Sequence, residues 1–238
     1  MIAETKFMGT NLQSNEFSPS PSTATQIASL LEQRIINREF LPGSRLVEEE
    51  LVNVFKVSRS PVREALRLVE RDGLVTIESR RGARVSLMNS SDLNEVYECR
   101  LALEGLATEC AAKNCEDNDK LNLRRRLKLL EADYANADPL AFFEANVKLT
   151  NAIHDTAKNI TLTRLIGTTA KQGFRYRYLA YQKAPNLMER SIESNREIVN
   201  AICSKRVKLA RTLMEEILLQ SWERISTILE TMDFRDDT

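Results

Sequence analysis

Apolar residues recur at helical spacing from about Ala24 onward, and we expect the ordered part of the chain to begin there. Residues 1–23 lack such a period and are rich in serine, threonine, asparagine and proline, so they predict a flexible arm. The first predicted helix ends before Leu41-Pro42-Gly43, because proline and glycine favour a turn. Its apolar face consists of Ile27, Leu30, Leu31 and Ile35.

Two further short helices are predicted directly after this turn. One begins at the acidic run Glu48-Glu49-Glu50, which suits the positive end of a helix dipole. The other begins after Ser58, a good N-cap, and ends at Asp72-Gly73. Its apolar face consists of Val62, Ala65, Leu66 and Val69.

A pair of strands completes the first half of the pattern. The segments 74–77 and 83–87 have the composition of strands and flank Ser79-Arg80-Arg81-Gly82, so they predict a hairpin with a basic tip. Three short helices followed by a hairpin are the layout of a winged helix-turn-helix domain. We therefore assign residues 24–88 to such a domain.

Beyond Asn89 the pattern is helical throughout, with no convincing strand. Six amphipathic helices are predicted, over residues 91–114, 117–136, 139–158, 161–183, 187–203 and 205–233. The chain as a whole is therefore expected to be mainly α, with an N-terminal winged helix-turn-helix and a C-terminal antiparallel all-helical bundle over residues 89–238.

Composition indicates an ordinary globular protein, with 42% hydrophobic and 29% charged residues. The formal net charge is +0, so any contact with nucleic acid must come from a local basic patch.

The four cysteines lack the short paired spacing of a zinc site or a disulfide framework. No apolar run is long enough to span a membrane and the N-terminus lacks the order of a secretion signal, so a cytoplasmic location is expected.

The third predicted helix carries a basic stripe beside its apolar face. Arg59, Arg63 and Arg67 lie four residues apart, and a guanidinium can pair two donors with guanine in the major groove. Ser58 and Ser60, at the positive end of the helix, suit phosphate oxygens. An isolated stripe of arginines is more often a solvated helix face. The adjacent tip with Arg80, Arg81 and Gly82 favours DNA binding instead, since a wing supplies a second basic contact.

This half of the sequence resembles the DNA-binding signature of GntR-type regulators. The resemblance rests on Leu41-Pro42-Gly43-Ser44-Arg45-Leu46, on Val57 through Leu66 and on Gly73-Leu74-Val75. It implies that Arg59 and Arg63 contact bases, that Ser58 contacts a phosphate and that Arg81-Gly82 lies at the wing tip. Glu49 departs from members that carry a basic residue at that position.

The helical half resembles the FCD effector domain of the FadR-like subfamily, most clearly over residues 96–104. Many such domains are similar in holding a divalent metal with one aspartate and three histidines. The corresponding positions here are Asn146, Thr150, Asn195 and Ile217. The single histidine of the chain, His154, has no carboxylate at ligand spacing, so neither a metal nor another cofactor is expected. We expect His154 to be a surface residue or a core residue with its hydrogen bonds satisfied.

Four polar residues are candidates for an effector pocket. Asn146 and Thr150 interrupt one apolar helix face and Asn195 interrupts another, so each needs a polar partner, either a ligand or a neighbouring helix. Arg100 suits a carboxylate ligand, and the resemblance places its helix along the pocket. The alternative for Arg100 is an intrahelical pair with Glu104. The prediction is a metal-independent pocket for a small organic anion.

Operators read by helix-turn-helix proteins are two-fold symmetric, so a homodimer is expected to bind double-stranded DNA. An enzyme is the main alternative, but the sequence has no phosphate-binding glycine loop, no G-x-S-x-G and no paired histidines. A helical ligand-binding or scaffold protein without DNA binding is a second alternative, which the retained arginines argue against. The prediction is a DNA-binding transcription regulator that is not an enzyme, with no membrane partner.

Overall fold

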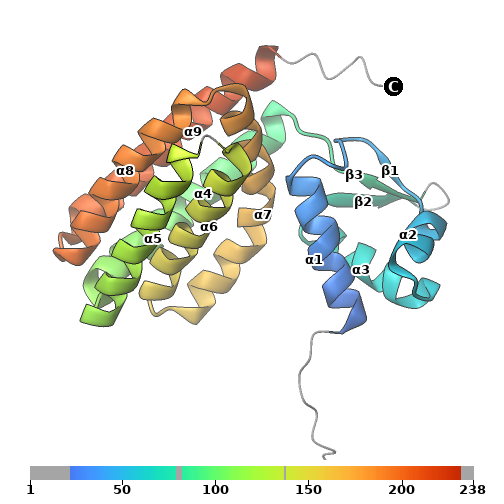
Figure 1. Ribbon diagram of the computed structural model, residues 1–238, viewed down its shortest axis with the longest axis horizontal. Coiled ribbons are helices and arrows are strands. Elements are labelled where there is room, and N and C mark those ends of the chain that lie inside the picture. The colour runs from blue at the N-terminus through green and yellow to red at the C-terminus, as the bar shows by residue number, and fades with distance from the viewer. Residues whose placement is uncertain (1–21, 79–81, 137, 232–238) are drawn as a thin grey trace, which may run out of the picture.

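The computed structural model describes residues 22–78, 82–136 and 138–231, and these form two hydrophobic cores. Figure 1 shows a winged part of short helices and strands beside a bundle of long helices. The predicted fold class, a winged helix-turn-helix followed by an all-helical bundle, is confirmed. The predicted arm, residues 1–23, lies almost wholly outside the described residues.

The winged part contains three helices packed on a small sheet. The helices are α1 (Thr23–Ile36), α2 (Glu48–Phe55) and α3 (Arg59–Arg71). The strands are β1 (Arg45–Leu46), β2 (Val75–Glu78) and β3 (Gly82–Val85), in the antiparallel order β1-β3-β2. Sequence analysis missed β1, because two residues are too short to show an alternating pattern.

Capping and burial explain why α3 forms where it does. Ser58 is the N-cap in an extended conformation, although its side chain makes no capping hydrogen bond. The apolar face predicted from the sequence is buried against α1 and the sheet, and consists of Val62, Ala65, Leu66 and Val69. Burying one such aliphatic side chain contributes about 1.5–3 kcal/mol, so this face fixes which side of α3 remains exposed.

The bundle contains the six helices expected from the sequence, each with ends within two residues of the prediction. They are α4 (Ser90–Asn114), α5 (Asp117–Ala135), α6 (Pro139–Thr156), α7 (Ile160–Lys183), α8 (Asn186–Cys203) and α9 (Val207–Thr231). Their starts are fixed locally: Asp138 accepts hydrogen bonds from the amides of Leu140 and Ala141, and Asn159 accepts one from Leu162.

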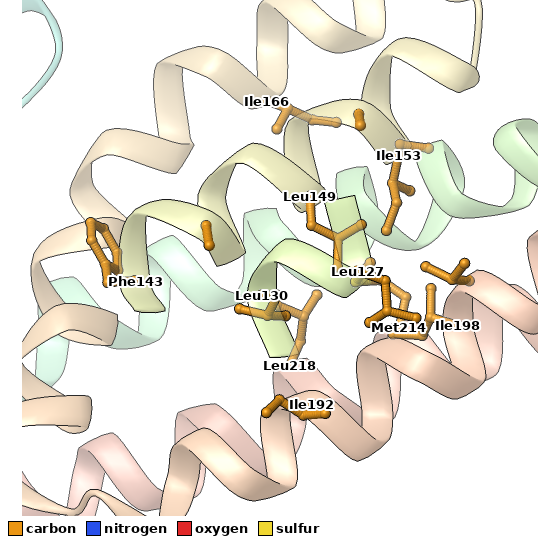
Figure 2. Packing of buried hydrophobic residues seen from close by; sticks show 14 of the residues in the cluster. Leu127, Leu130, Phe143, Leu149, Ile153, Ile166, Ile192, Ile198, Met214 and Leu218 are labelled. Atoms are coloured by element: carbon orange, nitrogen blue, oxygen red, sulfur yellow. The ribbon is translucent and has the colours of Figure 1, made fainter. Parts of the chain in front are cut away.

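Apolar side chains from the helices of the bundle meet in one core. Figure 2 shows α6, α5, α8 and α9 contributing to it. The labelled side chains are Leu127, Leu130, Phe143, Leu149, Ile153, Ile166, Ile192, Ile198, Met214 and Leu218. Two residues from the winged half and the connecting segment, Ile36 and Met88, also belong to this core, so the two halves are packed together.

Candidate functional site

The exposed face of α3 is basic. Arg59, Arg63 and Arg67 are all solvent-exposed and form a row beside the buried apolar face. Ser58 and Ser60 are exposed at the N-terminal end of the same helix. The structure thus brings these five side chains, all identified from the sequence, onto one accessible surface.

One arginine of this surface is held by a neighbouring helix. Nε of Arg63 donates a hydrogen bond of 2.8 Å to Glu48 at the start of α2. Among the residues that the structure describes, Arg59 and Arg67 form no ion pair. Because the Arg63–Glu48 pair is largely exposed, it contributes little to stability and leaves Arg63 able to exchange partners.

The structure describes part of the wing, the hairpin formed by β2 and β3. The predicted contacts Arg80 and Arg81 lie outside the described residues, whereas Gly82 is exposed at the start of β3. Gly82 has φ +86°, a conformation that glycine adopts without strain. Two further basic residues that sequence analysis missed, Arg45 and Arg84, are cross-strand partners and both exposed. The sequence could not show that they pair across β1 and β3, because β1 has only two residues and no recognisable pattern.

A pocket of about 420 Å³ lies inside the bundle, lined by residues of α4, α6, α7, α8 and α9. All four side chains predicted to bind an effector, Arg100, Asn146, Thr150 and Asn195, line it. Its volume lies near the lower end of the range found for small-molecule sites. The structure therefore brings together residues from three helices that the sequence could only place on separate faces.

The polar residues of the pocket also bond to the protein. Ser191 on α8 is their shared partner, and its Oγ accepts hydrogen bonds from Asn146 (2.9 Å), Asn195 (3.2 Å) and Tyr181 (3.1 Å). The Thr150 hydroxyl donates to the carbonyl of Asn146 at 3.0 Å. Asn146 thus bonds a neighbouring helix, whereas Thr150 and Asn195 bond atoms of their own helices, and all three residues line the pocket.

Arg100 is buried with a carboxylate beside it. Its Nε donates a 2.7 Å hydrogen bond to Glu104, the intrahelical partner considered above, while its Nη1 is buried without a partner. Gly173 makes room for this guanidinium, because a Cβ there would lie 3.0 Å from Arg100 Cδ. Burial, the largest single cause, would raise the pKa of Glu104, but Arg100 and His154 together outweigh it and hold that pKa well below its usual range.

His154 is buried near the same carboxylate. Its Nε2 lies 3.7 Å from Glu104, too far for a hydrogen bond, and this nitrogen has no hydrogen-bond partner. The expectation of a surface or fully satisfied residue is therefore wrong. The residue lies on the inner face of α6, in line with Thr150, because four residues make about one helical turn.

Arg177 on α7 lines the pocket and was missed by sequence analysis. The residue is 8% exposed, and its Nε and Nη2 are buried without hydrogen-bond partners. Its guanidinium lies over the rings of Phe174 and Phe143, 5.1 and 5.5 Å from their centroids. Burial is the main reason that the pKa of Arg177 is lowered, and the neighbouring Arg100 adds to it.

Helix α7 also contacts the winged half on another face. Lys171 lies between Glu32 of α1 and Asp72 at the end of α3, with Nζ 2.6 Å from a carboxylate oxygen of each. Arg175 donates to the carbonyl of Ser86, in the segment that joins the two halves. One helix therefore lines the pocket and holds the winged part.

Comparison with known proteins decides the family. The model described as "Bacterial regulatory proteins, gntR family" matches residues 23–85, and the FCD domain model matches residues 95–220, more than half of the chain. The chain belongs to the GntR family and carries an FCD domain. The resemblance seen in the sequence is thereby confirmed.

Relatives of this GntR chain are transcription regulators. It is 32% identical over 142 residues to the HTH-type regulator YdhC of Bacillus subtilis, which covers 59% of this chain and 63% of that protein. It is 32% identical over 123 residues to the gluconate operon transcriptional repressor of Bacillus licheniformis, covering 51% and 50%. The chain thus spans between half and 63% of the length of these relatives. Neither carries the name of an enzyme, in agreement with the prediction.

Two solved structures resemble the GntR chain over most of its length. McbR/YncC of Escherichia coli superposes with a TM-score of 0.79 at 21% identity, covering 88% of this chain and 99% of that one. A GntR transcriptional regulator from Rhodococcus sp. RHA1 gives 0.72 at 26% identity, covering 86% and 97%. Both share the order of a winged half and a helical half with this chain.

The donor set of this FCD domain does not fit the metal that many such domains hold. Asn146, Thr150, Asn195 and Ile217 all line the pocket, but they offer two neutral amides, a hydroxyl and an alkyl group. Within residues 22–78, 82–136 and 138–231, no three histidine, cysteine, aspartate or glutamate side chains gather around one point. Divalent transition metals need imidazole, thiolate or carboxylate ligands, so these four side chains do not fit such a metal.

Across the helices that the structure describes, none combines the length and the apolar character that crossing a bilayer requires.

Proposed function

We propose that this GntR chain is a transcription regulator that binds operator DNA as a homodimer and responds to a small organic anion. The single observation that carries the DNA-binding part is the exposed row Arg59–Arg63–Arg67 on α3, beside a wing with basic residues. A helix of this kind fits the major groove, and a dimer presents two such helices to a two-fold operator. We place this activity in the cytoplasm, where DNA is accessible.

The effector part rests on the pocket in the FCD domain. Its inner wall carries two buried arginines, Arg100 and Arg177, and one buried carboxylate, Glu104. This wall favours an anion over a cation or a neutral ligand, because an anion pairs with the excess positive charge. The Bacillus licheniformis relative is named after the gluconate operon, and gluconate is an organic acid of fitting size.

Ligand binding can alter DNA binding only if the ligand has different affinities for two arrangements of the winged halves. Helix α7 offers the connection, since it contributes Arg177 to the pocket and Lys171 to the contact with α1 and α3. The affinity for DNA would therefore depend on the position of α7 relative to the winged half.

The DNA-binding part is tested with fragments selected from the source genome by the purified protein. Affinity for a selected fragment is measured against salt for wild type, Arg59→Ala and Arg63→Ala. Loss of one bidentate base contact is expected to weaken specific binding by about 1–3 kcal/mol, or roughly 5- to 150-fold. Arg125→Ala, which removes an exposed arginine from α5, is the matched control and should bind like wild type.

Two results would contradict this function. A wild-type protein that retains no fragment at low salt would be a ligand-binding or scaffold protein without DNA binding. A protein whose affinity is unchanged by both arginine substitutions would bind DNA through another surface. Operator binding should also show a steep negative dependence on salt, because neutralised phosphates release counterions.

A further inference from the structure

One side chain of the pocket carries a charge that no described residue balances. Arg177 is almost fully buried, and its Nε and Nη2 have no hydrogen-bond partner. The nearby carboxylate, Glu104, is already paired with Arg100 at 2.7 Å. Burying a charge without a counterion is strongly unfavourable, so a group of this kind calls for an explanation.

The aromatic contacts of Arg177 do not supply what is missing. The rings of Phe143 and Phe174 attract the guanidinium through their faces, and this offsets part of the cost of burial. A phenyl ring nevertheless offers no oxygen to accept hydrogen bonds from Nε and Nη2. These rings pack against the flat guanidinium, and the Arg177 side chain lines the pocket while its Nε and Nη2 are buried.

The two unpartnered nitrogens lie on the same edge of the guanidinium. The N–H bonds of Nε and Nη2 on this edge run parallel, which is the geometry that binds both oxygens of a carboxylate at once. The polar neighbours across the pocket are less available, since the amide donors of Asn146 and Asn195 already reach Ser191. Arg100 adds one further free donor through its buried Nη1.

We propose that Arg177 is the residue that binds the carboxylate of the ligand, and that its fixed charge does the work of a metal ion in this pocket. The inference deepens the proposed function and rests on it. Arg100 then acts mainly through its pair with Glu104, which shapes the polar wall next to the carboxylate. Specificity for carboxylates follows from the paired donors, because a spherical anion such as chloride can use them less well.

The test compares wild type with Arg177→Met, which keeps the length and apolar contacts of the side chain but removes its charge. Without ligand the variant should melt at a higher temperature than wild type, because an unpaired buried charge is gone. Sodium acetate, small enough to enter any carboxylate site, should raise the melting temperature of wild type by about 2–4 °C over sodium chloride of equal ionic strength. It should not do so for Arg177→Met.

Two further measurements test the paired donors of Arg177 and the involvement of a metal. Arg177→Lys keeps the charge but loses the paired donors, so its shift with acetate should fall well below that of wild type. EDTA should leave the wild-type shift unchanged. The inference is overturned if acetate stabilises wild type and Arg177→Met equally, if acetate stabilises neither, or if EDTA abolishes the shift. Because the winged half is untouched, retained DNA binding in Arg177→Met would show that the DNA-binding part of the proposed function stands even if this inference fails.

Discussion

Lys171 of the bundle reaches the end of α3, with its Nζ 2.6 Å from a carboxylate oxygen of Asp72. Asp72 is the C-cap of α3 and is almost fully buried. The same Nζ lies 2.6 Å from Glu32 on α1, so one ammonium group joins two helices of the winged half. Lys171 and Arg177 are six residues apart on α7, which places the pocket and this contact on one rigid element.

Replacing this ammonium group should weaken both the fold and the coupling. Lys171→Met leaves two carboxylates at the contact without their cation, and we expect the free energy of unfolding to fall by about 1–3 kcal/mol. Chemical denaturation measures this loss. The response of DNA affinity to the ligand should shrink as well, because α7 no longer holds the end of α3.

The control for this variant is Lys128→Met. Lys128 is exposed on α5, and the described part of the chain offers it no ion pair. If Lys171→Met and Lys128→Met change stability and ligand response alike, the contact between the halves has no role in regulation.

The negative charge of Glu48 is expected to weaken DNA binding. Its carboxylate accepts the hydrogen bond of Arg63 and places a negative charge on the surface that we propose to meet phosphates. Glu48→Gln is expected to tighten binding to DNA of any sequence several-fold at low salt, with the difference shrinking as salt rises. Stability should change by less than about 1 kcal/mol, because the pair is exposed.

Fluorescence anisotropy with a labelled duplex measures the effect of Glu48→Gln. Glu193→Gln, on the exposed side of α8, removes the same charge far from α3 and should leave affinity unchanged. Weaker binding by Glu48→Gln would show that this carboxylate instead positions Arg63 for its contact.

Sequence patterns predicted the fold well because the elements are amphipathic and capped. The six helices of the bundle end at breaks such as Asp138-Pro139 and Ala184-Pro185, which are visible in the sequence. The α3 face of Val62, Ala65, Leu66 and Val69 is buried as its spacing indicates. Strand β1 escaped prediction because its pairing with β3 is a long-range contact rather than a local pattern.

The pocket was predictable only in part. Asn146, Thr150 and Asn195 stood out as polar residues on apolar faces, and the structure gathers them with Arg100 around one space. Arg177 did not stand out, because an arginine in a helix is usually exposed. A signal was present in its surroundings: Phe174, Tyr178 and Tyr181 lie on one face of α7 and Tyr176 on the opposite face, which is typical of a helical segment buried on more than one side.

Acid should destabilise the bundle through Glu104. Because the folded protein holds the pKa of Glu104 below its ordinary value of 4.5, the ionised carboxylate contributes stability that is fully present above pH 4.5. This contribution is lost as pH falls from 4.5 toward the folded pKa. Glu104→Gln should therefore be clearly less stable than wild type at pH 7.

Melting curves of wild type and Glu104→Gln between pH 7 and pH 3 measure this dependence. The two melting temperatures should converge as the pH falls, because protonation removes from wild type what the substitution removes from the variant. A gap that stays constant across this range would show that the charge of Glu104 contributes nothing to folding.

We propose that an anion held in the pocket changes how tightly α3 binds its operator. The most direct measurement is the operator affinity of wild type and Arg177→Met at fixed salt, with and without the carboxylate that stabilises wild type most. In wild type we expect a shift of at least about 5-fold, which corresponds to a coupling free energy of about 1 kcal/mol or more, and in Arg177→Met we expect no shift. An operator affinity that stays the same in wild type while the carboxylate is bound would contradict it.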